Sequence, residues 1–205
     1  STNMLFHSYV IDKVMKYYDC KGANKEHLTN YHRYMADKMN HRMADNLPLM
    51  YSNLITFENK TLMVGKSVKA EVDLIVFDTY SKTAALVELK NYTPVDNDAD
   101  AQRKEERINK AIKSRLEKDK RVLDNLEAFF EQNDIPKEYL SYQFSSLVVT
   151  SEYAGGVGIK ENIKVLDEAL FYYLLHICYG NLKEFIEFVE KGEFFNILEK
   201  NIKIA

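Results

Sequence analysis

Three ionisable side chains fall near the ends of two apolar segments that have the composition of strands. Asp73 lies within Glu-Val-Asp-Leu-Ile-Val-Phe (71–77), Glu88 follows fifteen residues later, and Lys90 comes two residues after Glu88. Strand side chains alternate between faces with a period of two, so Glu88 and Lys90 should point the same way. An unpaired charge is costly to bury, so these groups need partners or a ligand.

The residue types fit the chemistry of a divalent cation. Mg²⁺ prefers one or two carboxylates together with waters and phosphate oxygens. Asp73 and Glu88 would supply the carboxylates, and the carbonyl of Leu89 is a further candidate ligand. Such a metal lowers the pKa of a bound water, which Lys90 would orient or deprotonate. The three residues therefore predict Mg²⁺- or Mn²⁺-assisted phosphodiester hydrolysis; the alternative is a structural salt bridge at a sheet end.

The secondary-structure elements that must position these residues are predicted to form an α/β pattern. Residues 71–77 and 83–89 predict two strands joined by the turn-forming segment 78–82, hence a hairpin. Further strands are predicted over 54–63, 144–150 and 163–166. Helices are predicted over 4–18, 25–45, 99–133, 170–179 and 182–191, with a break at Pro48 and a loop over 154–158. This order indicates a central mixed sheet flanked by helices.

The hairpin also resembles a known family. Glu71-Val-Asp73-Leu-Ile-Val-Phe-Asp78 with Ala85-Leu-Val-Glu88-Leu-Lys90-Asn91-Tyr92 is similar to the PD-(D/E)xK nuclease superfamily, which includes restriction enzymes and Holliday junction resolvases. The Glu-Leu-Lys-Asn-Tyr string is most similar to nuclease-related (NERD) domains. The resemblance implies a restriction-endonuclease-like αβββαβ core over residues 25–180 and DNA cleavage in restriction, defence, recombination or repair. The alternative is an inactive module that binds nucleic acid or assembles a complex.

The resemblance implies further site residues, and the chain departs from the family at one of them. The proline of the family name is absent, since Val72 precedes Asp73. Relatives often carry another acid on the first core helix, for which three residues compete: Glu26, Asp37 and Asp45. We prefer Glu26, because glutamate is the usual type. Glu71 is a candidate additional metal ligand, because it is expected on the same strand face as Asp73.

A basic segment follows the hairpin. From Arg103 to Arg121 there are nine Lys or Arg against four Asp or Glu, although the whole chain has a net charge of -3. Arg103, Lys104 and Arg107 would contact backbone phosphates, and Gln102 stands where some relatives carry a catalytic glutamine. The alternative is a solvated helix face with i,i+4 pairs such as Glu117–Arg121. The predicted apolar stripe of this helix comprises Ile108, Ile112, Leu116, Leu123, Leu126 and Phe130.

The 205 residues suit a single domain. We expect an N-terminal helical appendage over 1–24, the core over 25–180 and a C-terminal helical extension over 181–205. No membrane helix or secretory signal is expected. Two distant cysteines, Cys20 and Cys178, predict a reducing cytoplasm rather than a disulfide framework. The aromatic groups at 171–173 and 194–195 predict either core or a homodimer contact.

Overall fold

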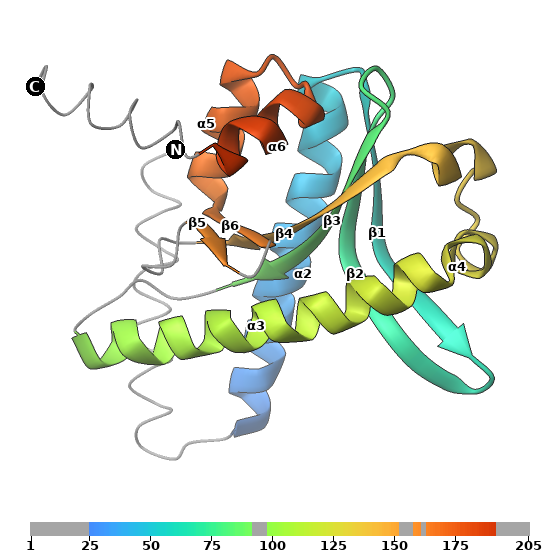
Figure 1. Cartoon of the computed structure of the whole chain (residues 1–205). Helices are drawn as coiled ribbons and strands as arrows, with labels where there is room; N and C mark the ends of the chain where they lie inside the picture. Colours follow the sequence, from blue (N-terminus) through green and yellow to red (C-terminus); the bar gives the residue numbers. More distant parts are fainter. Residues whose placement is uncertain (1–24, 92–97, 152–157, 161–162, 192–205) are drawn as a thin grey trace, which may run out of the picture.

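The computed structural model describes residues 25–91, 98–151, 158–160 and 163–191. The predicted helix 4–18, the N-terminal appendage and most of the C-terminal extension lie outside the described residues. The described chain forms one mixed sheet with helices on both faces (Figure 1). The predicted α/β class is therefore confirmed.

The sheet has six strands in the order β1-β2-β3-β4-β6-β5. The pairs β1/β2, β2/β3 and β5/β6 are antiparallel, while β3/β4 and β4/β6 are parallel. The strand bounds are β1 Leu54–Val64, β2 Ser67–Asp78, β3 Thr83–Lys90, β4 Gln143–Thr150, β5 Gly158–Lys160 and β6 Ile163–Asp167. The predicted 78–82 hairpin is confirmed, because Asp78 pairs with Thr83 across it. β5 is not among the predicted strands, and only its first residue, Gly158, lies in the predicted loop 154–158; three residues give too little periodicity to identify a strand.

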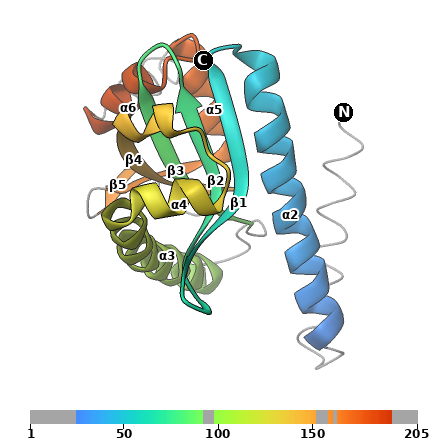
Figure 2. The same ribbon diagram turned by 90° about the vertical axis from the view of Figure 1, so that its right-hand side faces the viewer.

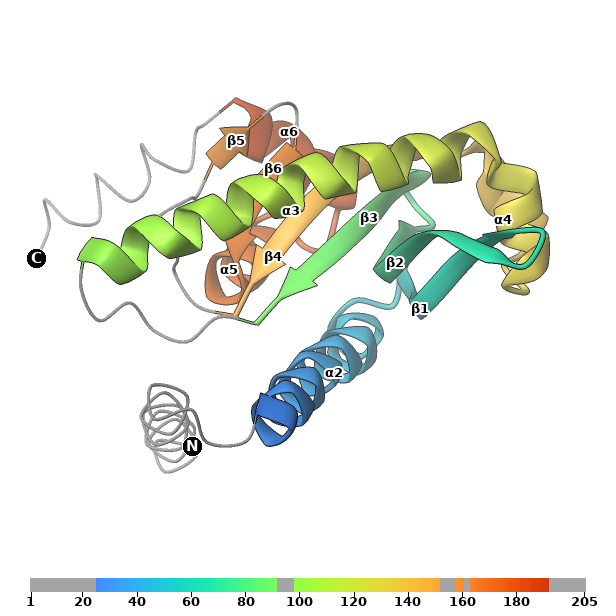
Figure 3. The ribbon, with the colours of Figure 1, turned by 90° about the horizontal axis from the view of Figure 1, so that it is seen from below.

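The helices divide between the two faces of the sheet (Figures 2 and 3). α2 (Lys25–Met50), α5 (Glu168–Ile177) and α6 (Leu182–Glu190) pack on one face, where Met43, Leu74, Val87 and Phe185 share a core cluster. α3 (Asp98–Asp124) and α4 (Leu126–Gln132) cover the other face. A short 3₁₀ helix, η1 (Lys137–Ser141), precedes β4. Figure 3 shows α3 crossing β3 and β4 on the side opposite α2.

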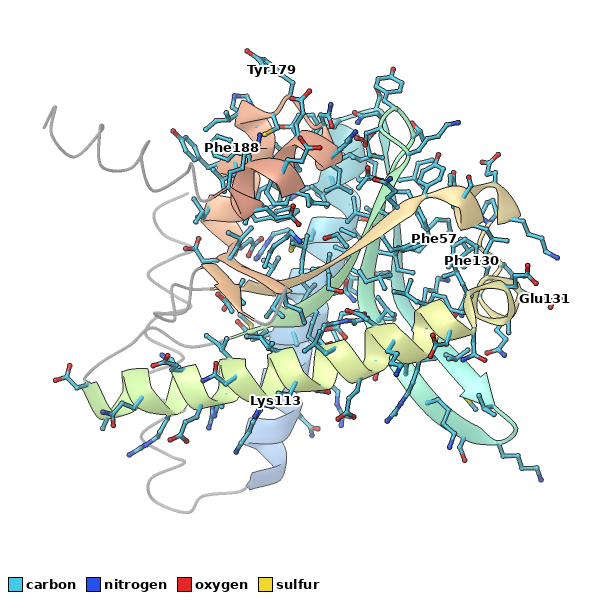
Figure 4. All side chains as sticks on the ribbon, in the orientation of Figure 1. Phe57, Lys113, Phe130, Glu131, Tyr179 and Phe188 are labelled. Atoms are coloured by element: carbon cyan, nitrogen blue, oxygen red, sulfur yellow. The ribbon has the colours of Figure 1, made fainter. Side chains whose placement is uncertain are left out.

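Aromatic side chains fill the core under α4. The ring of Phe77 stacks on Tyr139 with centroids 4.4 Å apart and meets Phe57 and Phe130 edge-on at 5.8 and 6.1 Å. These are the arrangements that the quadrupoles of aromatic rings favour. Figure 4 shows Phe57 and Phe130 turned into this layer between the sheet and α4. The buried second half of β2, residues 74–78, thereby packs against aromatic rings on one face and against α2 on the other.

The predicted break at Pro48 is wrong, because α2 continues to Met50. A proline at this position has no N–H to donate to the carbonyl four residues earlier. That carbonyl, on Ala44, instead accepts a 2.8 Å hydrogen bond from the Thr56 hydroxyl on β1. A tertiary hydrogen bond thus satisfies the group that the proline leaves unpaired, and the helix ends only two residues later.

The predicted helix 99–133 is two helices, separated at Asn125. The Asn125 side-chain amide donates to the carbonyl of Arg121 at 2.9 Å, which competes with continued helical hydrogen bonding. The predicted apolar stripe is also wrong in part: Leu116 and Leu123 are exposed, whereas Ile108, Ile112 and Val122 are buried. Within the described residues, none of these helices is both long and apolar enough to cross a bilayer.

The outer edge of β1 is closed by two side-chain amides. Asn133 accepts from the backbone N–H of Thr61 at 3.1 Å and donates to its carbonyl at 2.8 Å. Gln132 does the same for Met63, at 2.8 and 3.1 Å. Each amide makes the paired hydrogen bonds that a neighbouring strand would otherwise make with β1.

Asp78, at the end of β2, ties the hairpin to α6. Its buried carboxylate accepts from Asn53 Nδ2 at 2.8 Å, Ser81 Oγ at 2.6 Å and the backbone N–H groups of Tyr80 and Leu182, both at 2.9 Å. Burial by itself raises the pKa of this group, but the hydrogen bonds outweigh it and the pKa is lowered.

We therefore expect Asp78→Ala to lower the free energy of unfolding by about 2–4 kcal/mol at pH 7, because it leaves buried donors unsatisfied. Urea denaturation measures the change, with the exposed Asp45→Ala as the matched control. Since the folded-state pKa is lowered, the carboxylate stabilises the fold above its unfolded pKa, and this contribution disappears on acidification below about pH 4. Equal unfolding midpoints for the two variants at pH 7 would contradict the role assigned to Asp78.

Candidate functional site

The acids predicted from the sequence meet on neighbouring strands. β2 and β3 pair as far as Leu74 with Val87, and just beyond that point the Asp73 carboxylate accepts a hydrogen bond from the backbone of Leu89, next to Glu88. On β3, Lys90 Nζ lies 2.6 Å from Glu88 Oε1, as two residues on one strand face should. The hairpin thus brings Asp73, Glu88 and Lys90 together.

β2 is distorted at the point where Asp73 occurs. Val72 and Ile75, three residues apart, pack in the same core cluster, whereas Leu74 packs on the opposite face of the sheet. Across β1, Asn59 lies opposite Asp73 and has a positive φ of 52°. An irregularity of this kind re-aims a side chain within a strand. Asp73 is thereby turned to the α3 side, where Glu88 lies.

The distortion is held from α2 by Asn40. Its buried amide nitrogen lies 2.8 Å from both Asn59 Oδ1 and the backbone carbonyl of Asp73. Sequence reasoning missed Asn40, and the only signal for it was a polar residue next to Met39 and three residues before Met43 on the predicted helix. A helix on one face of the sheet therefore positions the backbone of an acid that points to the other face.

The Asp73 carboxyl is held in an environment that disfavours its charge. Oδ2 accepts from the backbone N–H of Leu89 at 2.8 Å. Burial, and next the negative charge of Glu88, raise the pKa of Asp73 to about 6, although the Leu89 hydrogen bond and two lysines oppose the shift. The two carboxylates therefore repel each other even with two lysines beside them.

Glu88 is almost fully buried, and three cations surround it. Lys90 Nζ is 2.6 Å from Oε1, Lys118 Nζ is 3.1 Å from Oε2, and Arg115 Nη1 is 3.5 Å from Oε2. Burial raises the pKa of this carboxyl, but Lys90, Lys118 and Arg115 together outweigh burial and lower it. Glu88 is therefore a carboxylate at neutral pH.

A second layer of polar groups lies behind Glu88. Arg115 has no exposed surface, and its guanidinium pairs with Asp119, with Nε 2.5 Å from Oδ1. Asp119 also accepts from the hydroxyl of Ser146 on β4. Burial raises the pKa of Asp119, and Arg115 and Ser146 counteract this effect. The pair anchors α3 across the sheet and keeps one guanidinium against the rear of Glu88.

Sequence reasoning missed Arg115, Lys118 and Asp119, because their segment was predicted as a basic solvent face. Positions 108, 112, 115, 119 and 122 have the spacing of one helix face, and all five side chains are almost fully buried. An arginine and an aspartate four residues apart within that spacing were the signal that could have identified a buried pair. The predicted Glu117–Arg121 pair on the solvent face is present, at 3.5 Å.

The remaining predicted residues are placed less centrally. Arg103, Arg107 and Gln102 are exposed near the start of α3, and Lys104 is buried. A helix rises 1.5 Å per residue, so Arg107 lies about 16 Å along the axis from Lys118. The side chain of Glu26 lies outside the described residues. Asp37 and Asp45, its competitors on α2, are exposed.

Glu71 is exposed, and the break in alternation between it and Asp73 removes the argument that the two share a strand face. In the part of the chain that the structure describes, no three or more His, Cys, Asp and Glu side chains form a group able to hold a metal ion. Two carboxylates remain, Asp73 and Glu88, and Mg²⁺ requires only one or two when waters and phosphate oxygens complete its shell. A cation would also relieve the repulsion that raises the pKa of Asp73, so the residues fit a water-rich Mg²⁺ or Mn²⁺ site.

The raised pKa of Asp73 predicts a specific dependence of stability on pH. Because the folded-state value is about 6 and the model-peptide value is 3.8, the contribution of this group is most favourable below pH 4 and is lost as pH rises through 6. Asp73→Asn stays neutral throughout. Relative to wild type, it should therefore gain about 2–3 kcal/mol of stability between pH 4 and pH 7.5.

Urea denaturation in EDTA at the two pH values measures this gain. The exposed Asp37→Asn controls for the general effect of removing a negative charge. Parallel stability curves for wild type and Asp73→Asn would show that the folded protein does not disfavour the Asp73 carboxylate.

Comparison with known proteins found no match: no family model, curated protein or solved structure is similar to this chain above the level of chance. Its function therefore has to be inferred from its own residues and their geometry.

Proposed function

We propose that this chain is a divalent-metal-dependent nuclease that hydrolyses phosphodiester bonds, with DNA as its substrate. The observation that carries the proposal is the pair of carboxylates facing each other across β2 and β3, with the Lys90 ammonium 2.6 Å from one of them. Hydrolysis of a phosphodiester needs charge neutralisation at phosphorus and a positioned water. Two carboxylates beside a lysine, where the pairing of β2 with β3 ends, supply groups for both tasks.

Each residue has a defined role in this proposal. Asp73 and Glu88 would hold Mg²⁺ or Mn²⁺, and the carbonyl of Leu89 remains a candidate third ligand. The metal would polarise the phosphate and lower the pKa of a water. Lys90 has a third of its side chain exposed, so its ammonium can meet substrate from solvent. It would hold or move a proton of the attacking water, or neutralise charge that develops on the phosphate.

The arrangement of the elements supports the restriction-endonuclease-like core that the motif implies. In chain order α2, β1, β2, β3, α3 and the parallel strand β4 follow the pattern αβββαβ, interrupted only by α4 and η1. The acids lie on its second and third strands, as the resemblance implies. DNA rather than RNA is proposed on that resemblance alone, and the inactive binding module is the alternative that the following experiments separate.

Titration calorimetry with Mn²⁺ tests the metal site. Wild type should bind the ion, whereas Asp73→Asn and Glu88→Gln should each lose most of the affinity, because each removes one of two charged ligands. The exposed Asp45→Asn is the matched control. Binding that survives in both site variants would place the metal elsewhere.

Cleavage assays test the reaction itself. Single-stranded, duplex and branched DNA, and RNA, are incubated with Mg²⁺ or Mn²⁺ and with EDTA. Glu88→Gln should abolish cleavage, and Lys90→Ala should reduce the rate by roughly 10²–10⁴, as for a lost acid/base group. The exposed Lys66→Ala, in the β1–β2 turn, is the control for loss of a positive charge. Cleavage at one rate in all variants would indicate a contaminating nuclease, and Mn²⁺ binding without cleavage would favour the inactive module.

A further inference from the structure

Three positively charged side chains surround the single carboxylate of Glu88. Arg115 already has its own partner in Asp119. Lys90 Nζ lies 2.6 Å from Glu88 Oε1, and Lys118 Nζ lies 3.1 Å from Oε2 and 3.4 Å from Oε1. A cation bound by Asp73 and Glu88 would take over the charge of that carboxylate. Two ammonium groups would then lie side by side without a counter-charge of their own on Glu88.

The two lysines are also the outermost charges of the cluster. Their side chains are 33% and 25% exposed, whereas those of Glu88, Asp119 and Arg115 are 4%, 6% and 0% exposed. They come from different elements, Lys90 from β3 and Lys118 from α3, so they flank Glu88 from two directions. Other lysines of α3 do not share this placement: Lys113 points away from the sheet (Figure 4) and Lys120 is exposed.

Glu88 would not be left unpaired if the lysines moved away. Arg115 remains 3.5 Å from Oε2, and its pairing with Asp119, which Ser146 in turn supports, holds it in the core. Lysine ammonium groups on four-carbon stems can change partners by rotation, whereas a buried guanidinium held by its own carboxylate cannot do so readily. Glu88 therefore has one fixed cation, Arg115, on its buried side. The two lysines on its exposed side, Lys90 and Lys118, can change partners.

We propose that Lys118 is a second phosphate-binding residue of this site, which with Lys90 exchanges Glu88 for the phosphate oxygens of a nucleic-acid backbone. The inference rests on the proposed nuclease function. It adds a phosphate contact by Lys118, in the second half of α3. This residue lies about 16 Å along the helix axis from Arg107, the nearest of the residues expected to contact phosphates at the start of α3. Ammonium groups bind phosphate as point charges, so the contact would position the backbone without reading sequence.

The first experiment needs no metal and no catalysis. Fluorescence anisotropy measures binding of a labelled 20-nucleotide single strand, and of its duplex, to the full chain in EDTA. Glu88→Gln should bind more tightly than wild type, because both lysines lose their carboxylate. Adding Lys118→Gln should reverse this gain by roughly tenfold, as expected for one charge-assisted hydrogen bond, and should lower the salt slope by about one. Adding Lys120→Gln instead is the matched control.

The second experiment uses the Glu88-containing protein with Ca²⁺ as the cation. Lys118→Gln should bind the oligonucleotide roughly tenfold more weakly than wild type, and Lys118→Arg should restore most of the affinity, because it keeps the charge. Without nucleic acid, Lys118→Gln should bind Mn²⁺ more tightly, since a cation competing for Glu88 is gone. A purely structural lysine would not shift these two affinities in opposite directions.

The outcomes separate this inference from the proposed function. Equal losses in the Lys118→Gln and Lys120→Gln proteins, in both experiments, would overturn the inference while leaving a nuclease that depends on Asp73, Glu88 and Lys90. Absence of Mn²⁺ binding and of cleavage in wild type would overturn the proposed function. The comparison in EDTA would still decide whether Lys118 binds phosphate, and the Ca²⁺ experiment decides it if the Glu88→Gln variants do not fold.

Discussion

The burial of one carboxylate, Glu88, determines how this molecule is assembled around its central strand. A charge on β3 that has almost no access to water requires cations, and β3 itself provides only Lys90. The other two come from α3, so α3 must cross the sheet where Arg115 and Lys118 reach Glu88. Helix placement is thus set by electrostatics as well as by the apolar contacts of Ile108, Ile112 and Val122.

The Arg115–Asp119 pair occupies space that apolar side chains would fill in most helix-to-sheet contacts. Buried ion pairs are often no more stabilising than well-packed hydrophobic residues of similar volume. Their presence under a carboxylate with a proposed catalytic role therefore indicates a compromise between stability and function. Asp73 shows the same compromise, since burial and a neighbouring acid disfavour its charged form. The strained electrostatics are confined to one end of the hairpin, while aromatic packing around Phe77 supports the other end.

Local patterns were sufficient to predict the hairpin and the meeting of Glu88 with Lys90. The strand-like composition of 71–77 and 83–89 and the turn residues between them are short-range signals, and the structure confirms the hairpin that they predict. The predictions that were wrong concern features that depend on tertiary contacts. Leu116 and Leu123 were expected in the core, but both are exposed, and Arg115 and Asp119 share the buried face of α3 with apolar residues. Pro48 did not end α2, because a hydroxyl on β1 satisfies the carbonyl that the proline leaves without a donor.

The candidate site shows the same difference between short-range signals and tertiary contacts. Its residues on one hairpin could be predicted from spacing, whereas Asn40, Arg115, Lys118 and Asp119 lie far away in sequence and only topology brings them together. The expectation that Glu71 shares a face with Asp73 assumed regular alternation, which the distortion opposite Asn59 interrupts.

The side-chain amides of Gln132 and Asn133 limit how copies of this chain can associate through β1. An exposed edge strand of eleven residues is a template on which a strand from another molecule can add. Here two side chains occupy the backbone groups of Thr61 and Met63, as a fragment of a neighbouring strand would. At the other margin β5 spans only three residues, too few to offer a long ladder. Addition of a further strand is therefore blocked at Thr61 and Met63 of β1, and β5 offers only a short partner at the other margin.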